Sequence, residues 1–102
     1  MKDLGIASSV CIDEVNSRLF LSTFIYEGKK MKIAVFNFDK DKMEFKEDRC
    51  MLMNGHSMLI DALIYIPEYN VLVSGGYDEK IIIWGFSGKK GKFLKFKELD
   101  NI

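Results

Sequence analysis

The sequence predicts an all-β protein built from two four-stranded antiparallel sheets. Short apolar runs are separated by turn signals at about ten-residue spacing, as in chains made of short strands. No segment keeps the i, i+3, i+4 apolar spacing of an amphipathic helix over a dozen positions. The order of runs and turns also occurs twice, with a period of about 50 residues, which predicts two copies of one structural unit.

The repeat emerges when the chain is shifted by 52 positions against itself. The matched segments are 9–12 with 61–64, 19–22 with 71–74, and 33–36 with 81–84, the last requiring a first-copy loop (26–30) that is four residues longer. This period suits a four-stranded propeller blade and is too long for most solenoid repeats.

Four strands are expected in the first copy, at about 8–13, 18–25, 31–38 and 42–52. The second and third contain LFLSTF and KIAVFNF, which are apolar at consecutive positions and therefore indicate strands buried on both faces. The fourth contains KMEFKED, whose charged residues alternate with apolar ones, as is typical of a charge-protected edge strand.

The second copy is expected to follow the same order, with strands at about 58–66, 71–77, 80–86 and 91–98. VLVSG and KIIIWGF form its apolar middle strands, and KFLKFKEL is its charged edge. Ser87–Gly91 is interpreted as a turn, because no phosphate-loop pattern opens a helix there. Asp39–Asp41 begins like a calcium loop, but Met43 and Glu44 stand where an oxygen ligand and a glycine are required.

The stretch from Gly55 to Trp84 carries the most specific motif of the chain. A Gly-His pair is followed by two apolar runs, a Ser-Gly-Gly-Tyr-Asp turn and a final run that ends in tryptophan. This order resembles one WD40 repeat, the unit of a β-propeller. The resemblance implies two propeller blades, at 1–54 and 55–102, in which the first blade is degenerate: Phe36 replaces the tryptophan, and Ser22 is the one signature residue retained.

The resemblance also implies a hydrogen-bonded side-chain chain inside the second blade, made of Trp84, Ser74, His56 and Asp78. A buried indole N–H needs an acceptor, a serine hydroxyl can accept and donate onward, and an aspartate can fix the imidazole tautomer. We therefore interpret these residues as a structural tetrad. A Ser-His-Asp hydrolase site is disfavoured because Ser74 lies within an apolar strand without a G-x-S-x-G turn.

No catalytic, metal or cofactor site is predicted, since one histidine and the scattered Cys11 and Cys50 do not form a ligand set. Cys11 is expected on the innermost strand of a blade and Cys50 on its outermost strand. Three strand spacings of about 4.8 Å would separate them, too far for a disulfide.

Two blades alone would leave one apolar sheet face open on each side, because propellers close with about four to eight blades. If each face carries on the order of 500 Å², exposure forfeits roughly 12 kcal/mol. We therefore expect either a fragment of a larger propeller or a short subunit that completes one by association with itself or another chain.

The predicted function is a noncatalytic scaffold that binds other proteins. The resemblance implies docking on loops at one rim, which points to Met58 and Tyr77; packing of Met58 against a neighbouring blade is the other interpretation. The alternative function is binding of phospholipid or nucleic acid through two lysine clusters, at 29–32 and 89–97.

Charge and length constrain the partners further. Fifteen Lys and Arg balance fifteen Asp and Glu over 102 residues, whereas a general nucleic-acid binder shows a basic excess. The start of the chain lacks a signal-peptide core, and no apolar run reaches the roughly 18 residues of a membrane span. An intracellular, cytoplasmic protein is expected.

Overall fold

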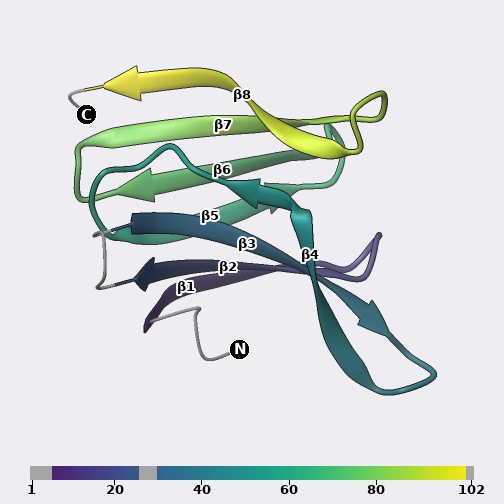
Figure 1. Cartoon of the computed structure of the whole chain (residues 1–102). Helices are drawn as coiled ribbons and strands as arrows, with labels where there is room; N and C mark the ends of the chain where they lie inside the picture. Colours follow the sequence, from purple (N-terminus) through teal and green to yellow (C-terminus); the bar gives the residue numbers. More distant parts are fainter. Residues whose placement is uncertain (1–5, 26–29, 101–102) are drawn as a thin grey trace.

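The computed structural model describes residues 6–25 and 30–100, except for the side chains at 6, 25, 30 and 49–53. The described residues form eight strands in two antiparallel four-stranded sheets, which confirms the predicted all-β class (Figure 1). Sheet A contains β1 (Ile6–Asp13), β2 (Arg18–Ile25), β3 (Lys30–Asp39) and β4 (Glu44–Met53). Sheet B contains β5 (Ile60–Ile66), β6 (Val71–Gly76), β7 (Lys80–Ser87) and β8 (Lys92–Asp100).

Four-residue turns connect the hairpins at one end of both sheets, which we call the hairpin end (right in Figure 1). Each of these turns closes on a residue with φ between 52° and 66°, the left-handed region that lets strands reverse tightly. These residues are Ser17, Met43, Asn70 and Gly91. Asp39 Oδ1 accepts the amides of Asp41 and Lys42, so the segment that begins like a calcium loop is a capped hairpin turn.

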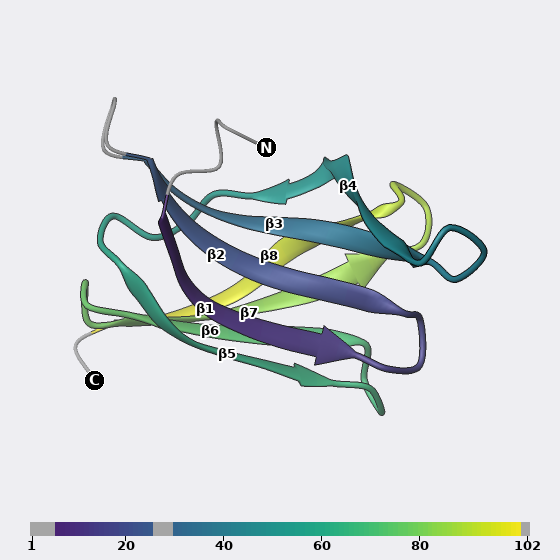
Figure 2. The ribbon, with the colours of Figure 1, turned by 90° about the horizontal axis from the view of Figure 1, so that it is seen from below.

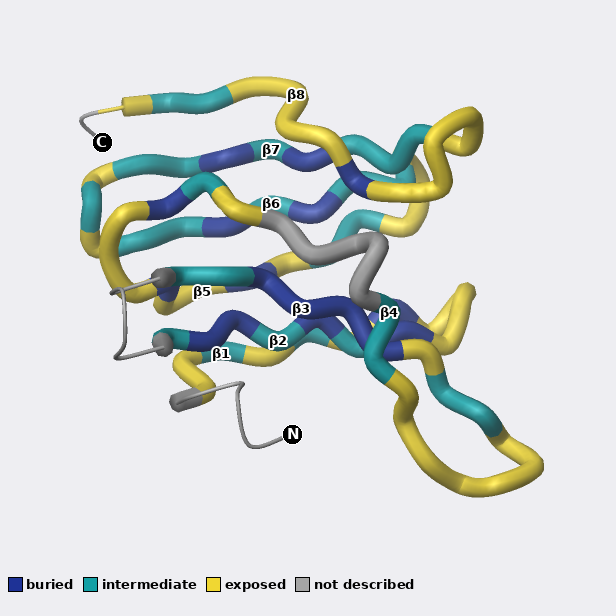
Figure 3. The backbone as a smooth tube through the Cα atoms, viewed as in Figure 1, coloured by how far each residue is buried: buried dark blue, intermediate teal, exposed yellow. Residues whose placement is uncertain are grey.

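The two sheets pack face to face, with β5 lying beside β1 and β2 (Figure 2). The main cluster of buried residues lies between the sheets, where Phe20 of β2 stacks on Tyr65 of β5 and meets the edge of Phe93 from β8. Along the backbone, buried segments are found in β3, β6 and β7 (Figure 3). Cys11 is a free thiol on β1, and burial raises its pKa. The Cys50 side chain lies outside the described residues.

Among the described side chains, burial on both faces is found at Ser22 and Thr23 of β2, which are 0% and 3% exposed, and over a longer run in β3. Residues 33–36 of β3 are all at most 3% exposed. In β6 and β7, by contrast, buried residues alternate with half-buried ones: Leu72 and Ile82 are 0% exposed, whereas Val73 and Ile83 are half-buried. The half-buried residues lie on the face of sheet B that points away from sheet A.

Strand pairing corrects the predicted repeat by one residue. Asp13 pairs with Arg18 across the first hairpin and Ile66 with Val71 across the second, so equivalent positions there are 53 apart (13 to 66, 18 to 71) and not 52. Leu21, and not Ser22, is therefore the equivalent of Ser74.

The predicted match of 33–36 with 81–84 is correct. Phe38 pairs with Phe45 and Phe86 with Phe93, which gives an offset of 48 in the second half of each sheet (38 to 86, 45 to 93). A slip of one residue in the first half matters because it exchanges the two faces of a strand.

Candidate functional site

The four residues singled out by the sequence motif lie in one hydrogen-bonded chain. They come from four places: His56 from the β4–β5 loop, Ser74 from β6, Asp78 from the β6–β7 turn and Trp84 from β7. Trp84 Nε1 donates to Ser74 Oγ at 2.9 Å, and Ser74 Oγ lies 2.8 Å from His56 Nε2. His56 Nδ1 in turn lies 3.1 Å from Asp78 Oδ1. We call these residues the tetrad and their end of the sheets the tetrad end.

A neutral imidazole satisfies every member of the tetrad. Ser74 Oγ accepts the indole hydrogen and can donate its own hydrogen to His56 Nε2, which leaves Nδ1–H to donate to Asp78. Asp78 Oδ2 also accepts the amide of Ser57 at 2.9 Å, which ties the loop to the turn. Because Ser74 is 0% exposed and engaged on both sides, its hydroxyl is not placed to attack a substrate.

The environment of Asp78 favours its charged form. Burial raises the pKa of this carboxyl, but hydrogen bonds from the amide of Ser57, from His56 and from the amide of Lys80 outweigh it and hold the pKa below its usual value. The side chains of His56 and Asp78 are 0% and 4% exposed, so water competes little for the hydrogen bond between them. The tetrad therefore joins loop, turn and two strands through a chain of satisfied bonds.

Two glycines make room for the tetrad. A Cβ atom on Gly55 would lie 2.8 Å from Cη2 of Trp84, and one on Gly76 would lie 2.7 Å from His56 Nδ1. Since real Cβ contacts are longer than this, a larger residue at either position would displace a tetrad ring. The glycine of the Gly-His pair is thus explained by close packing against the indole.

Met58 and Tyr77, the predicted docking residues, are both exposed at the tetrad end, at 49% and 60%. The amide of Tyr77 donates to the carbonyl oxygen of Leu59, so the loop that carries Met58 and the turn that carries Tyr77 are bonded together. Leu59 is itself 37% exposed. These three side chains form an exposed apolar group, which we call the rim, next to the buried tetrad.

A second polar network, missed from sequence, lies between the sheets at the hairpin end. Arg18 Nη2 lies 2.7 Å from Asp13 Oδ2 and donates to Tyr65 and to Asn70 Oδ1. The Arg18 guanidinium carbon lies 5.0–5.7 Å from four ring centroids, those of Phe20, Tyr65, Phe86 and Phe93. The cation thus bridges both sheets inside an aromatic cage.

Asp13 is the anion of this network and is 0% exposed. It accepts the amides of Val15 and Asn16 and the side-chain amide of Asn16. Burial raises its pKa, but these bonds and the Arg18 charge outweigh burial and lower it. An Asp and an Arg flanking a four-residue turn face each other across a hairpin, and that spacing is the signal that could have revealed the pair.

Ser22, the serine predicted to survive from the signature, has another role. Its hydroxyl bonds to Ser8 and Ser9, and all three hydroxyls lie within 2.7–3.3 Å of the carbonyl oxygen of Ile60. These serines therefore join β1 and β2 of sheet A to the start of β5.

No group of three or more His, Cys, Asp or Glu side chains within residues 6–25 and 30–100 is arranged to hold a metal ion. The same residues include no helix that is long and apolar enough to cross a membrane. No protein-family model matches the sequence.

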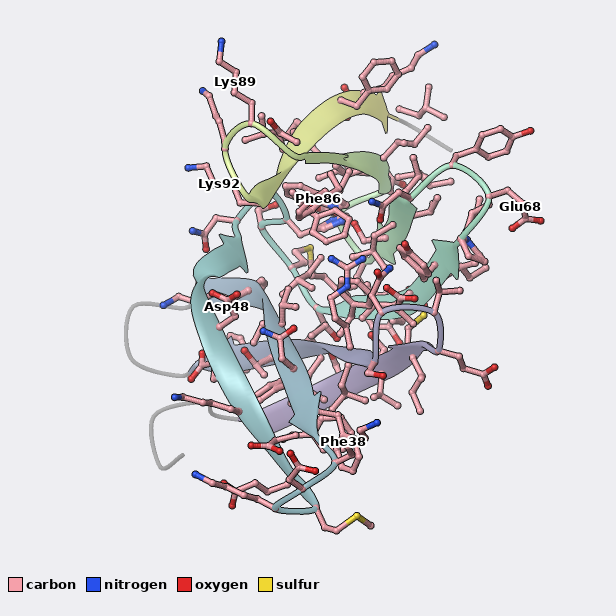
Figure 4. All side chains as sticks on the ribbon, turned by 90° about the vertical axis from the view of Figure 1, so that its right-hand side faces the viewer. Phe38, Asp48, Glu68, Phe86, Lys89 and Lys92 are labelled. Carbon is pink, nitrogen blue, oxygen red and sulfur yellow. The ribbon has the colours of Figure 1, made fainter. Side chains whose placement is uncertain are left out.

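The lysine clusters are only partly described, since Lys29 lies outside the described residues. Lys80 and Lys95 form ion pairs with Glu98, and hydrogen bonds from these two lysines lower the Glu98 pKa to about 2. Lys89 and Lys92 extend from the β7–β8 turn and the start of β8 (Figure 4).

Proposed function

We propose that this protein is a noncatalytic scaffold of the WD40 type, whose two sheets act as propeller blades and whose rim binds another protein. The observation that carries the proposal is the tetrad, whose serine, histidine and aspartate are all committed to buried structural bonds next to an exposed rim. A rigid end that displays Met58, Leu59 and Tyr77 offers anchors of the kind enriched at interfaces.

The electrostatics favour a protein partner over an anionic surface. The chain has zero formal net charge, and Lys95 of the larger lysine cluster is paired with Glu98. Binding to phosphate backbones needs several uncompensated cations on one face. The scaffold is therefore the better-supported function of the two.

The test is site-specific photo-crosslinking from the rim in the native cells. A benzophenone side chain replaces Tyr77 in one variant and Tyr69 in a matched control, which is 78% exposed in the β5–β6 turn at the opposite end. We expect one defined protein to be captured from position 77 and not from position 69. Equal capture from both positions, or none from position 77, would contradict the proposal.

The captured protein is then purified and titrated against variants of this chain. Met58→Ala combined with Tyr77→Ala should weaken binding about tenfold or more, whereas Tyr69→Ala should leave it unchanged, because energetic anchors are few and local. Retained affinity in the double variant would place the interface elsewhere.

A further inference from the structure

The strand registers show that sheets A and B use opposite faces to contact each other. Sheet A contacts sheet B through the face that carries Phe20 and Val35. The equivalents of these residues in sheet B are Val73 and Ile83, which lie on the face that points away from sheet A. The two sheets are therefore related as successive members of a series, in which each unit has a front and a back.

The front of sheet B is the face packed on sheet A, and it carries Tyr65, Leu72, Trp84, Phe86 and Phe93. The equivalents in sheet A, at offsets of 53 and 48, are Ile12, Leu19, Phe36, Phe38 and Phe45. Every one of them is apolar, so sheet A has a front of the same character, and no third sheet formed by the described residues packs on it.

Figure 4 shows this difference for one equivalent pair, with Phe86 between the sheets and Phe38 on the outer side of sheet A. Phe36, in the middle of the sheet A front, is already buried at 3% exposure. The exposed strip lies along β1 and the hairpin end, where Val10, Ile12 and Phe45 are 57%, 61% and 49% exposed. The same part of sheet B, along β5, makes its closest approach to sheet A.

The back of sheet B has the complementary character. Cross-strand pairing puts Ile64, Val73 and Ile83 in one row, and Ile64 is 60% exposed. A Cβ atom on Gly85 would meet nothing within 4 Å, since no other element covers this face in the described part of the chain. These positions are equivalent to residues on the face of sheet A that packs against sheet B.

A groove on the sheet A front corresponds to the aromatic cage of Arg18. It has a volume of about 250 Å³. Its lining comprises Ile12, Ser17, Phe38 and Phe45, together with Asp13, Glu14 and Arg18. The equivalents of Ile12, Ser17, Phe38 and Phe45 in sheet B are Tyr65, Asn70, Phe86 and Phe93, which surround Arg18 at the internal contact. The equivalent of Arg18 on the open back of sheet B is Val71, an apolar side chain that suits the part of the groove formed by Ile12, Phe38 and Phe45.

We propose that this chain associates with a second copy of itself head to tail, the front of sheet A in one copy packing on the back of sheet B in the next. Val71 of one copy then occupies the Ile12–Phe45 groove of the other, as Arg18 occupies the internal cage. Because each copy keeps one front and one back free, the contact repeats until the series closes into a ring. This inference is independent of the rim, which lies at the opposite end from the groove.

The test uses charged substitutions at the exposed positions of each face. Ile12→Lys blocks the front and Ile64→Lys blocks the back, and both sites are exposed enough to leave the fold intact. Tyr69→Lys, in the β5–β6 turn, is the matched control. Masses in solution are measured by analytical ultracentrifugation over a roughly hundredfold concentration range, and thermal melts verify that each variant is folded.

We expect the unmodified chain and Tyr69→Lys to form oligomers, and each blocked variant to be monomeric. An equimolar mixture of the two blocked variants should form a one-to-one dimer and nothing larger, because one intact front then meets one intact back. A monomeric unmodified chain would overturn the proposal. So would self-association of either blocked variant, which indicates a front-to-front or back-to-back contact, or a mixture that stays monomeric.

Discussion

Trp84 of sheet B and Phe36 of sheet A occupy equivalent positions and are each 3% exposed, but their surroundings differ. The indole N–H is satisfied by Ser74, which leads on to His56 and Asp78. The equivalent of Ser74 in sheet A is Leu21, which is apolar, as is the ring of Phe36. A buried ring without a polar atom needs no partner, so sheet A buries its aromatic residue without a tetrad.

The polar groups of sheet A serve the contact between the sheets instead. Arg18 and Asp13 lie at the hairpin end of the contact between the sheets. Their equivalents in sheet B are Val71 and Ile66, which are both apolar. The polar network of sheet B thus links elements within that sheet, whereas the polar network of sheet A links it to sheet B. The comparison teaches that the four-stranded unit tolerates either arrangement when the buried polar side chains of the tetrad and of the Arg18–Asp13 network are hydrogen-bonded.

The largest expected effect comes from breaking the network of sheet A. Arg18→Met keeps much of the apolar contact with the four rings but leaves the buried Asp13 without its cation, so we expect a loss of about 3 kcal/mol in the free energy of unfolding. Urea denaturation measures it. Adding Asp13→Asn to Arg18→Met should restore part of the loss, since the unpaired buried charge is then gone. A loss below about 1 kcal/mol in Arg18→Met would show that the contacts with the four rings, and not the ion pair, stabilise the packing of the two sheets.

Breaking the tetrad of sheet B should have a smaller effect. His56→Ala and Asp78→Ala should each lower the free energy of unfolding by about 1–3 kcal/mol, because each leaves a buried partner unsatisfied. The double variant should lose clearly less than the sum of the single losses, since both remove one chain of bonds. Trp84→Phe tests the comparison directly, because it gives sheet B the ring of sheet A. Unchanged stability in all three single variants would mean that the tetrad contributes nothing.

The strands and the tetrad could be predicted from the sequence, whereas the pairing register could not. Turn residues and apolar runs mark the strands, and the spacing of Gly55, His56 and Trp84 is specific to one arrangement. Around Leu21 and Ser22, however, apolar and small residues occupy both faces, so no period-two pattern fixes which face a residue takes. The identity of the two serines then favoured the wrong alignment by one position.

The Arg18 network escaped prediction for another reason. Its hydrogen-bonded members come from the β1–β2 and β5–β6 hairpins, and Asn70 lies 52 residues from Arg18, so their proximity depends on how the sheets pack. The local half of the network, Asp13 with Arg18, could be found from hairpin geometry. The cage of four rings could not, because sequence shows no side-chain contact between two sheets.

The last prediction compares the two networks through acid. The pKa values of Asp13 and Asp78 are both below the usual 3.8, so each folded carboxylate binds protons less readily than its unfolded counterpart. Their contribution to stability is therefore complete above about pH 5 and is lost as the pH falls below 4 through the folded pKa values. Asp13→Asn and Asp78→Asn should each be less stable at neutral pH and should each show a shallower decline in acid than the unmodified chain.

Urea midpoints measured from pH 7 to about pH 2 test this, since the midpoint follows stability at constant slope. Glu98, whose pKa of about 2 is set by Lys95 and Lys80 at the surface, adds its own acid dependence. Its share should shrink in about 1 M salt, because exposed pairs are screened, whereas the shares of the two buried carboxylates should persist. If Asp13→Asn and Asp78→Asn follow the same acid curve as the unmodified chain at both salt concentrations, neither network stabilises its carboxylate and the lowered pKa values are wrong.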